Sequence, residues 1–156
     1  MRITKLLITA TLTLGLCAPL MAGDNIGQQL IKSAKKWDVK GISPDALKKM
    51  IDEEKDLWML DIRDPYMRVE GSIEGLDNAA VARGNLEFKI EDEIEDKKAL
   101  IIVYCRSGKV AVLAAQTLKK TMKYQNVVYL EGGLDGWLEA GYSVFNHLGE
   151  LKLNKD

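Results

Sequence analysis

The stretch ALIIVYCRSGKVAVLAAQTLKK, residues 99–120, decides the fold of this chain. Its opening residues are apolar and rich in β-branched types, a run typical of a buried strand. Cys105 follows, and Arg106-Ser107-Gly108 then forms a turn signal. From Lys109 to about Met122 the apolar residues recur at helical spacing. The stretch therefore predicts a central strand, a tight loop that begins at a cysteine, and a helix.

The predicted position of Cys105 favours reactive chemistry. Backbone N–H groups of a short loop at a helix N-terminus attract anions, and the same field favours a thiolate over a thiol. Arg106 and Lys109 add positive charge near the loop. We therefore predict that Cys105 is a catalytic nucleophile for an anionic, sulfur-bearing substrate. The alternative is a buried structural cysteine.

The first 22 residues have the pattern of a secretory signal peptide. Arg2 and Lys5 form a basic start, an apolar core covers residues 6–16, and Ala22 offers a cleavage site. The apolar run is too short to serve as a stable span of a bilayer. We expect a cleaved signal over residues 1–22, a periplasmic mature protein, and no membrane anchor after processing.

Processing changes the charge and the cysteine count. The whole chain has a net charge of −1, and loss of Arg2 and Lys5 makes it −3. This charge excludes a generally basic nucleic-acid binder. Removal of Cys17 leaves Cys105 without a partner for an internal disulfide. An unpaired thiol in an oxidising compartment favours a chemical role or deep burial.

Strand and helix patterns alternate along the mature chain. They predict one α/β domain with a mostly parallel central sheet flanked by helices in three layers. We assign an N-terminal helix to residues 23–38, the domain to residues 39–143, and a loosely attached polar tail to residues 144–156. The elements expected inside the domain are a strand at 39–42, a helix from Pro44, strands at 57–62 and 79–82, a helix at 86–94, a strand at 127–130 and a helix at 134–140.

Two local expectations follow from this arrangement. The apolar face of the N-terminal helix should pack on the domain or serve as a spacer, and it consists of Ile26, Leu30, Ala34 and Trp37. Ligands bind beyond the carboxyl ends of parallel strands. Three segments follow expected strands and should meet at that edge: Asp61-Ile62-Arg63, the loop from Cys105, and Glu131-Gly132-Gly133.

The ordered set of motifs resembles a rhodanese domain, a sulfurtransferase module. The resemblance covers about residues 40–143, and the export signal with its extra helix is similar to periplasmic thiosulfate and polysulfide sulfurtransferases. Three positions depart from the family pattern: Ser72 stands where histidine is usual, Met67 where glutamate is common, and Val110 where arginine is frequent. The motifs are Asp61-Ile62-Arg63-Asp64-Pro65, Gly71-Ser72-Ile73, Cys105-Arg106-Ser107-Gly108, and Leu130-Glu131-Gly132-Gly133 followed by Trp137 and Gly141.

The resemblance implies a mechanism and a set of site residues. Cys105 would take the outer sulfur of an anionic donor as a persulfide and pass it to a thiol, cyanide or protein acceptor. Asp61 and Arg63 would brace the loop. No metal or organic cofactor is implied, and the lone His147 predicts no metal site. The loop residues that would hold donor and persulfide are Arg106, Ser107, Gly108, Lys109, Val110 and Ala111.

Two other functions use similar local features. A cysteine-based phosphatase needs an arginine at the sixth position after its cysteine to hold the phosphoryl group, and Ala111 stands there. A non-catalytic carrier of sulfane sulfur would keep Cys105 as an enzyme would. The departures at Ser72 and Val110 bear on the choice of donor more than on sulfur transfer itself.

Overall fold

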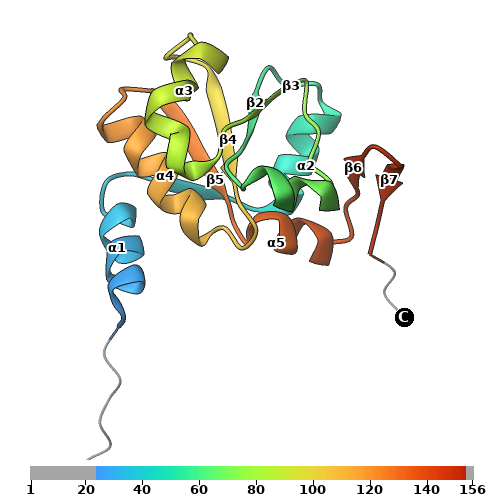
Figure 1. The fold of residues 1–156 in the computed structure, drawn as a ribbon, viewed down its shortest axis with the longest axis horizontal. Helices are drawn as coiled ribbons and strands as arrows, with labels where there is room; N and C mark the ends of the chain where they lie inside the picture. Colours follow the sequence, from blue (N-terminus) through green and yellow to red (C-terminus); the bar gives the residue numbers. More distant parts are fainter. Residues whose placement is uncertain (1–23, 154–156) are drawn as a thin grey trace, which may run out of the picture.

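A five-stranded parallel sheet forms the centre of the protein. The computed structural model describes residues 24–153 and shows the predicted α/β architecture (Figure 1). The strand order is β1-β5-β4-β2-β3, and every neighbouring pair is parallel. The strands are β1 (Lys40–Ile42), β2 (Trp58–Asp61), β3 (Asp77–Ala80), β4 (Leu100–Tyr104) and β5 (Asn126–Leu130).

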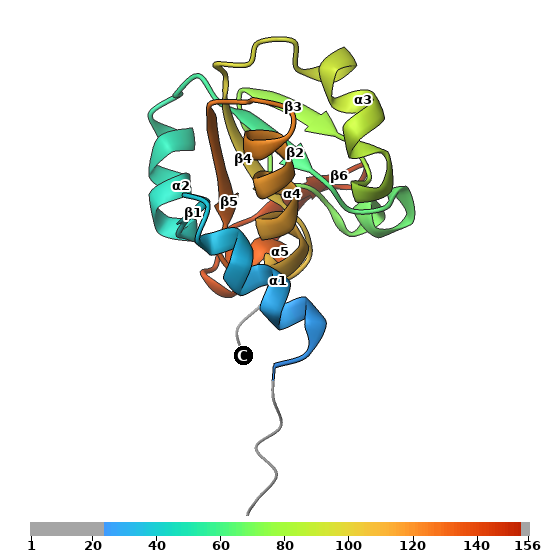
Figure 2. The same cartoon turned by 90° about the vertical axis from the view of Figure 1, so that its left-hand side faces the viewer.

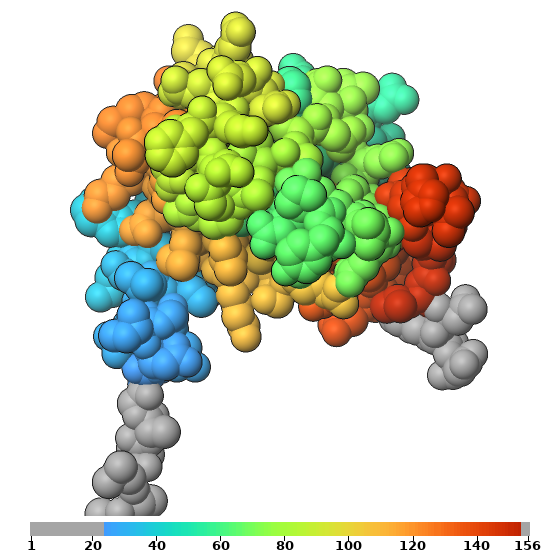
Figure 3. All heavy atoms as spheres, in the orientation of Figure 1, coloured from blue at the N-terminus to red at the C-terminus, as the bar shows by residue number. Residues whose placement is uncertain are grey.

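Helices cover both faces of this sheet, which confirms the three predicted layers (Figure 2). One face packs against α2 (Pro44–Asp52) and α5 (Gly133–Glu139). The other packs against α1 (Ile26–Lys35), α3 (Leu86–Glu93) and α4 (Lys109–Lys120). Two short 3₁₀ helices, η1 (Pro65–Glu70) and η2 (Arg83–Asn85), follow β2 and β3. Figure 3 shows η1 in green and the η2–α3 segment in yellow-green on the face toward the viewer.

Strand β4 lies in the middle of the sheet, and its apolar side chains point alternately into the cores on the two faces. Ile101 and Val103 belong to the core beneath α4, whereas Ile102 and Tyr104 belong to the core beneath α2 and α5. All four are almost completely buried. Each aliphatic chain of this size contributes about 1.5–3 kcal/mol when fully buried. The strand that ends at Cys105 is therefore held from both sides.

The N-terminal helix packs on the domain, but with a different face from the one predicted. Ala34 is buried and Ile31 packs against the core beneath α4. Ile26, Leu30 and Trp37 are largely exposed. The prediction was wrong for these three, and Trp37 lies beyond the end of α1 at Lys35. The predicted signal peptide, residues 1–22, lies outside the described residues.

Residues 144–151 form a hairpin that pairs with the domain, which differs from the loosely attached tail predicted for residues 144–156. Strands β6 (Val144–Asn146) and β7 (Gly149–Leu151) form an antiparallel hairpin. Ser72 N–H donates to Phe145 O at 2.8 Å and Phe145 N–H donates to Ser72 O at 2.9 Å. Val144 is buried beside Trp137. Two three-residue strands are too short to show a period in sequence, which is why the pattern was missed. Within residues 24–153, no helix has the length and apolar character to span a bilayer.

Candidate active site

The cysteine predicted from sequence lies at the carboxyl end of β4 and opens the loop before α4. Cys105 is 6% exposed, and it is unpaired. Gly108 is the N-cap of α4 and has a φ of +77°, a conformation that disfavours side chains. A Cβ at Gly108 would also come within 2.9 Å of the Leu130 carbonyl oxygen. The tight turn after the cysteine therefore requires glycine.

The backbone of this loop presents a row of unused donors. The N–H groups of residues 106–111 donate no hydrogen bond to any other residue in the described part of the chain. Along the chain after Cys105, the first backbone N–H with an acceptor is that of Val112, which donates to Gly108 O at 3.2 Å. Helix α4 has twelve residues, so its dipole adds partial positive charge at the same place. The loop is thus equipped to hold an anion or a thiolate beside Cys105.

Helix α5 fixes the direction in which these donors point. Leu134 N–H donates to Cys105 O at 2.9 Å, and Asp135 N–H donates to Arg106 O at 3.0 Å. The C=O and N–H of a trans peptide unit point in opposite directions. The amides that follow these two carbonyls therefore face away from α5. Gly133 permits the close approach, because a Cβ there would lie 2.4 Å from Cys105 O.

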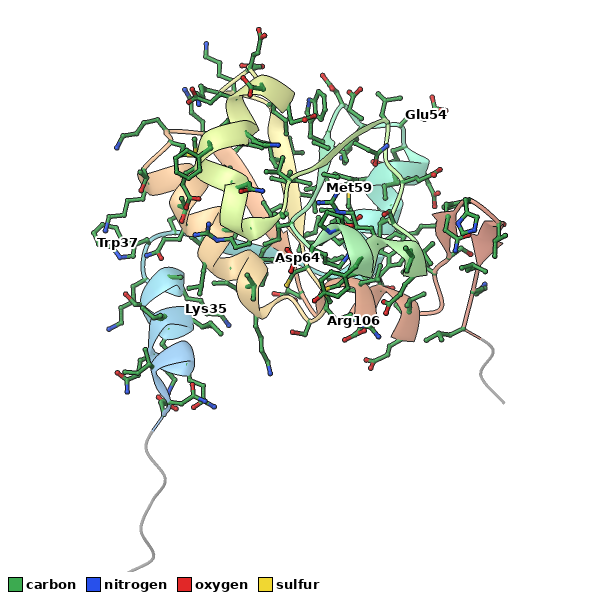
Figure 4. The ribbon with its side chains drawn as sticks, viewed as in Figure 1. Lys35, Trp37, Glu54, Met59, Asp64 and Arg106 are labelled. Carbon is green, nitrogen blue, oxygen red and sulfur yellow. The ribbon has the colours of Figure 1, made fainter. Side chains whose placement is uncertain are left out.

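Cys105 lines a cavity of about 450 Å³. Its walls come from the segment after β2, from η2, and from the loop before α4. Figure 4 shows Arg106 beyond the carboxyl end of β4, with Asp64 above it in that view. The lining residues are Ile62, Arg63, Asp64, Met67, Arg83, Gly84, Cys105, Arg106, Ser107 and Val110.

Asp61 and Arg63 form a buried ion pair, of which Arg63 belongs to the cavity lining. Arg63 Nη2 lies 2.6 Å from Asp61 Oδ2, and each residue is 3% exposed. Burial acts to lower the pKa of Arg63, but the hydrogen bond and the charge of Asp61 outweigh it and leave that pKa raised. Arg63 also donates to Gly71 O at 2.7 Å and to Met67 O at 3.3 Å. The pair thus ties the end of β2 to η1, which forms one cavity wall.

Arg106 lines the cavity at Cys105 and also pairs with two carboxylates. Its Nη1 pairs with Glu70 of η1, and its Nε pairs with Asp135 of α5. Lys109 is exposed and lines a neighbouring cavity of about 260 Å³ together with Lys35 and Glu131, and Ser107 lines both cavities. The two partners of Arg106 are 36 and 29 residues away in the chain, so no local pattern in the sequence indicated these ion pairs.

Comparison with known families agrees with this geometry. The profile of the rhodanese-like domain matches residues 43–140, which is more than half of the chain. The chain belongs to the rhodanese-like domain family. The resemblance inferred from the motifs is thereby confirmed at the level of the family and the fold.

Relatives of this rhodanese-like domain include sulfurtransferases by name. A Bacillus subtilis strain 168 protein named "Putative sulfurtransferase YtwF" is 31% identical over 102 residues, covering 64% of this chain and 91% of that protein. The polysulfide-sulfur transferase homodimer of Wolinella succinogenes is 28% identical with a TM-score of 0.62, covering 81% of this chain and 87% of that one. A rhodanese-related protein of Thermoplasma volcanium is 25% identical with a TM-score of 0.57, covering 66% and 94%.

The cavity of this rhodanese-like domain also includes residues that were not among the predicted site residues. Met67 and Arg83 line it, together with Ile62 of the predicted Asp61-Ile62-Arg63 segment. Arg83 pairs with Glu87 at 2.9 Å and donates through Nη2 to Thr117 Oγ1 at 3.3 Å. The segment that carries Met67 has no clear period, so no signal placed it beside Cys105. Within residues 24–153, no group of three or more His, Cys, Asp or Glu side chains is arranged to hold a metal ion.

Proposed function

We propose that this protein is a sulfurtransferase that moves sulfane sulfur from an anionic donor to a thiophilic acceptor through a persulfide on Cys105. The resemblance favours thiosulfate or polysulfide as donor. One observation carries the proposal: Cys105 lies on a cavity at the start of a loop whose N–H groups, from residue 106 to residue 111, have no acceptor among the described residues. Such a cradle stabilises negative charge on sulfur through both halves of a transfer.

Each half of the reaction balances. The Cys105 thiolate attacks the outer sulfur of the donor and forms a new S–S bond. The donor's own bond to that sulfur breaks, and its electron pair leaves with sulfite or with a shortened polysulfide. An acceptor thiolate or cyanide then attacks the outer sulfur of the persulfide, and the electron pair of the S–S bond returns to Cys105. Loop amides hold the charge that develops on each sulfur, and one such donor is worth about 3–4 kcal/mol in comparable sites.

The decisive variant is Cys105→Ser. Wild-type protein treated with thiosulfate or polysulfide should gain the mass of one sulfur atom and should form thiocyanate repeatedly when cyanide is supplied. Cys105→Ser should do neither, while its thermal unfolding stays close to that of the parent because only one atom changes. Retained turnover in the variant would contradict the proposal.

The same assay separates the alternatives. A sulfur carrier would take up one sulfur at Cys105 and release it once to a partner without sustained thiocyanate formation. A phosphatase would hydrolyse an aryl phosphate. The phosphatase is disfavoured because Ala111 is buried at the position where that chemistry requires an arginine.

A further inference from the structure

A second cavity lies beside the cysteine loop, between that loop and α1. Its volume is about 260 Å³, and Ser107 lines both this cavity and the one at Cys105. Helix α1 packs on α4 and supplies Ile31 and Lys35 to the wall (Figure 2). Both residues precede residues 43–140, the part of the chain that matches the family profile. This space, which we call the α1 cavity, therefore depends on an element outside the matched domain.

The wall of the α1 cavity contains a buried hydroxyl without a partner. Tyr129 lies on β5, is 7% exposed, and forms no side-chain hydrogen bond with any described residue. Every fully enclosed side-chain oxygen or nitrogen in the described part of the chain has a hydrogen-bond partner. The Tyr129 hydroxyl must therefore reach open space, and the α1 cavity is the space that this residue lines. A tyrosine buried to this extent ordinarily has a partner for its hydroxyl, so this one is a donor available to a ligand.

The charged side chains of the α1 cavity are more positive than negative. Lys35 and Lys109 line it, and neither forms an ion pair within residues 24–153. Glu131 contributes a carboxylate to the same lining. Its side chain lies over Gly41 of β1, where an added Cβ would collide with it. Two cations thus face one carboxylate, and the balance of charge favours an anion.

The start of α4 adds backbone donors to the same space. Ser107, Gly108 and Lys109 belong to the lining, and their N–H groups have no acceptor among the described residues. Helix α4 has twelve residues, so its dipole adds partial positive charge here. Tyr129 and Lys35 bring a phenol from β5 and a cation from α1 to this helix start. Three elements therefore converge on one small polar space.

From these observations we propose that the α1 cavity binds a small oxyanion that makes Cys105 less reactive. Lys35 and Lys109 offset its charge, and the hydroxyls of Tyr129 and Ser107 donate to its oxygens. A volume of about 260 Å³ is below the range of about 300–1,000 Å³ typical of drug-sized ligands, so the ligand is an inorganic oxyanion or a small organic acid. Its negative charge lies beside the loop that opens at Cys105 and opposes the thiolate there. This effect does not depend on sulfur transfer.

Calorimetric titration tests the binding with two probes, sulfate and succinate, each exchanged for chloride at constant ionic strength. The wild type should bind at least one probe, and the tighter one identifies the ligand as an inorganic anion or as an organic acid. Tyr129→Phe should weaken binding about tenfold, because it loses a hydrogen bond to a charged group. Lys35→Gln should weaken binding about two- to fivefold, the range for an exposed charge. Without the probe, Tyr129→Phe should unfold at the temperature of the wild type, since its hydroxyl has no partner to lose.

Lys36→Gln is the matched control, because Lys36 is an exposed cation next to Lys35 that does not line the α1 cavity. Its affinity for each probe should stay within about twofold of the wild type. Failure of both probes to bind, or equal losses in Lys36→Gln and Lys35→Gln, would overturn the proposal. Binding that is unaffected by Tyr129→Phe would place the anion elsewhere and would overturn it too.

The link to Cys105 is tested by alkylation with iodoacetamide, which is neutral and does not compete for an anion site. A saturating concentration of the bound probe should slow alkylation of the wild type several-fold. Tyr129→Phe should need about tenfold more of the probe to reach the same effect. An alkylation rate that does not change while calorimetry shows the cavity to be filled would overturn the link, and it would leave the proposed sulfur transfer intact.

Discussion

Tyr104 precedes Cys105 and makes the free energy of unfolding of the protein depend on pH. Burial raises the pKa of Tyr104, and the charge of Asp61 raises it further. Its hydroxyl oxygen accepts a hydrogen bond from Ile73 N–H at 3.3 Å. A phenol whose pKa is raised by folding stabilises the fold below its unfolded pKa of about 10, and that stabilisation is lost as pH rises above this value.

Tyr104→Phe should therefore flatten the alkaline side of the stability curve. Above about pH 10, the free energy of unfolding of the wild type should fall by about 1.4 kcal/mol per pH unit more than that of the variant. Near neutral pH the variant should be less stable by about 1 kcal/mol, because Ile73 N–H loses its acceptor. Urea unfolding at pH 7 to 11 measures both effects. Tyr66→Phe is the control, since Tyr66 is largely exposed, and equal alkaline slopes in Tyr104→Phe and wild type would contradict the argument.

The junction between α5 and the cysteine loop is the element on which the site depends most. Gly133 has a φ of +59°, and a Cβ there would lie 2.5 Å from Gly108 N as well as close to Cys105 O. Gly133→Ala should displace the loop, lower stability by about 1–3 kcal/mol beyond the backbone cost, and abolish persulfide formation.

Gly141→Ala is a control that separates the cost of a positive φ from the cost of a steric contact. Gly141 also has a positive φ, at +89°, but a Cβ added there would meet no other atom within 4 Å. This variant should lose only about 1–2 kcal/mol and keep its sulfur transfer. The measurements are denaturant unfolding and intact mass after donor treatment. A Gly133→Ala protein that matched Gly141→Ala in both would show that the α5 junction does not hold the loop.

The β6–β7 hairpin is a second element with a measurable contribution. It covers Ile73 and Trp137 through Val144, and Trp137 Nε1 donates to Ser143 O at 2.8 Å. Truncation after Tyr142 should lower the free energy of unfolding by about 2–4 kcal/mol, from lost burial and an unpaired indole N–H. Truncation after Leu151 should have little effect, because Lys152 and Leu153 are exposed. Equal melting temperatures for the two truncated proteins would show that the hairpin does not contribute to the stability of the domain.

Helices and strands that have a strong local sequence pattern and pack against the core could be predicted from the sequence. The run before Cys105 and the period after Lys109 indicated β4 and α4, and Ser43-Pro44 indicated the start of α2, where Ser43 Oγ accepts from Ala46 N–H at 3.2 Å. The cavity walls could not be predicted in this way. Met67 and Arg83 share the cavity lining with Cys105 only through tertiary packing, and Arg106 forms ion pairs with partners that no local pattern connects to it.

At the scale of the whole molecule, we propose that the chain is exported and processed. The basic start, the short apolar core and Ala22 motivate this proposal. The mature protein should begin near Gly23 and be recovered from the periplasm without detergent. N-terminal sequencing of the exported protein decides the matter. A retained Met1 or a lipid on Cys17 would contradict it.

The pairing of β1 with β5 has a consequence for how the chain can fold as it is made. Lys40 lies opposite Val128 and Ile42 lies opposite Leu130, while α1 packs on α4. Both native partners of the N-terminal segment thus belong to the last third of the chain. During synthesis β1 has no partner in the sheet until β5, which ends at residue 130, has emerged, and contacts so distant in sequence form slowly. Strands β2, β3 and β4 pair with one another and can meet earlier, so β1 is expected to join the sheet last, after β5 has paired with β4.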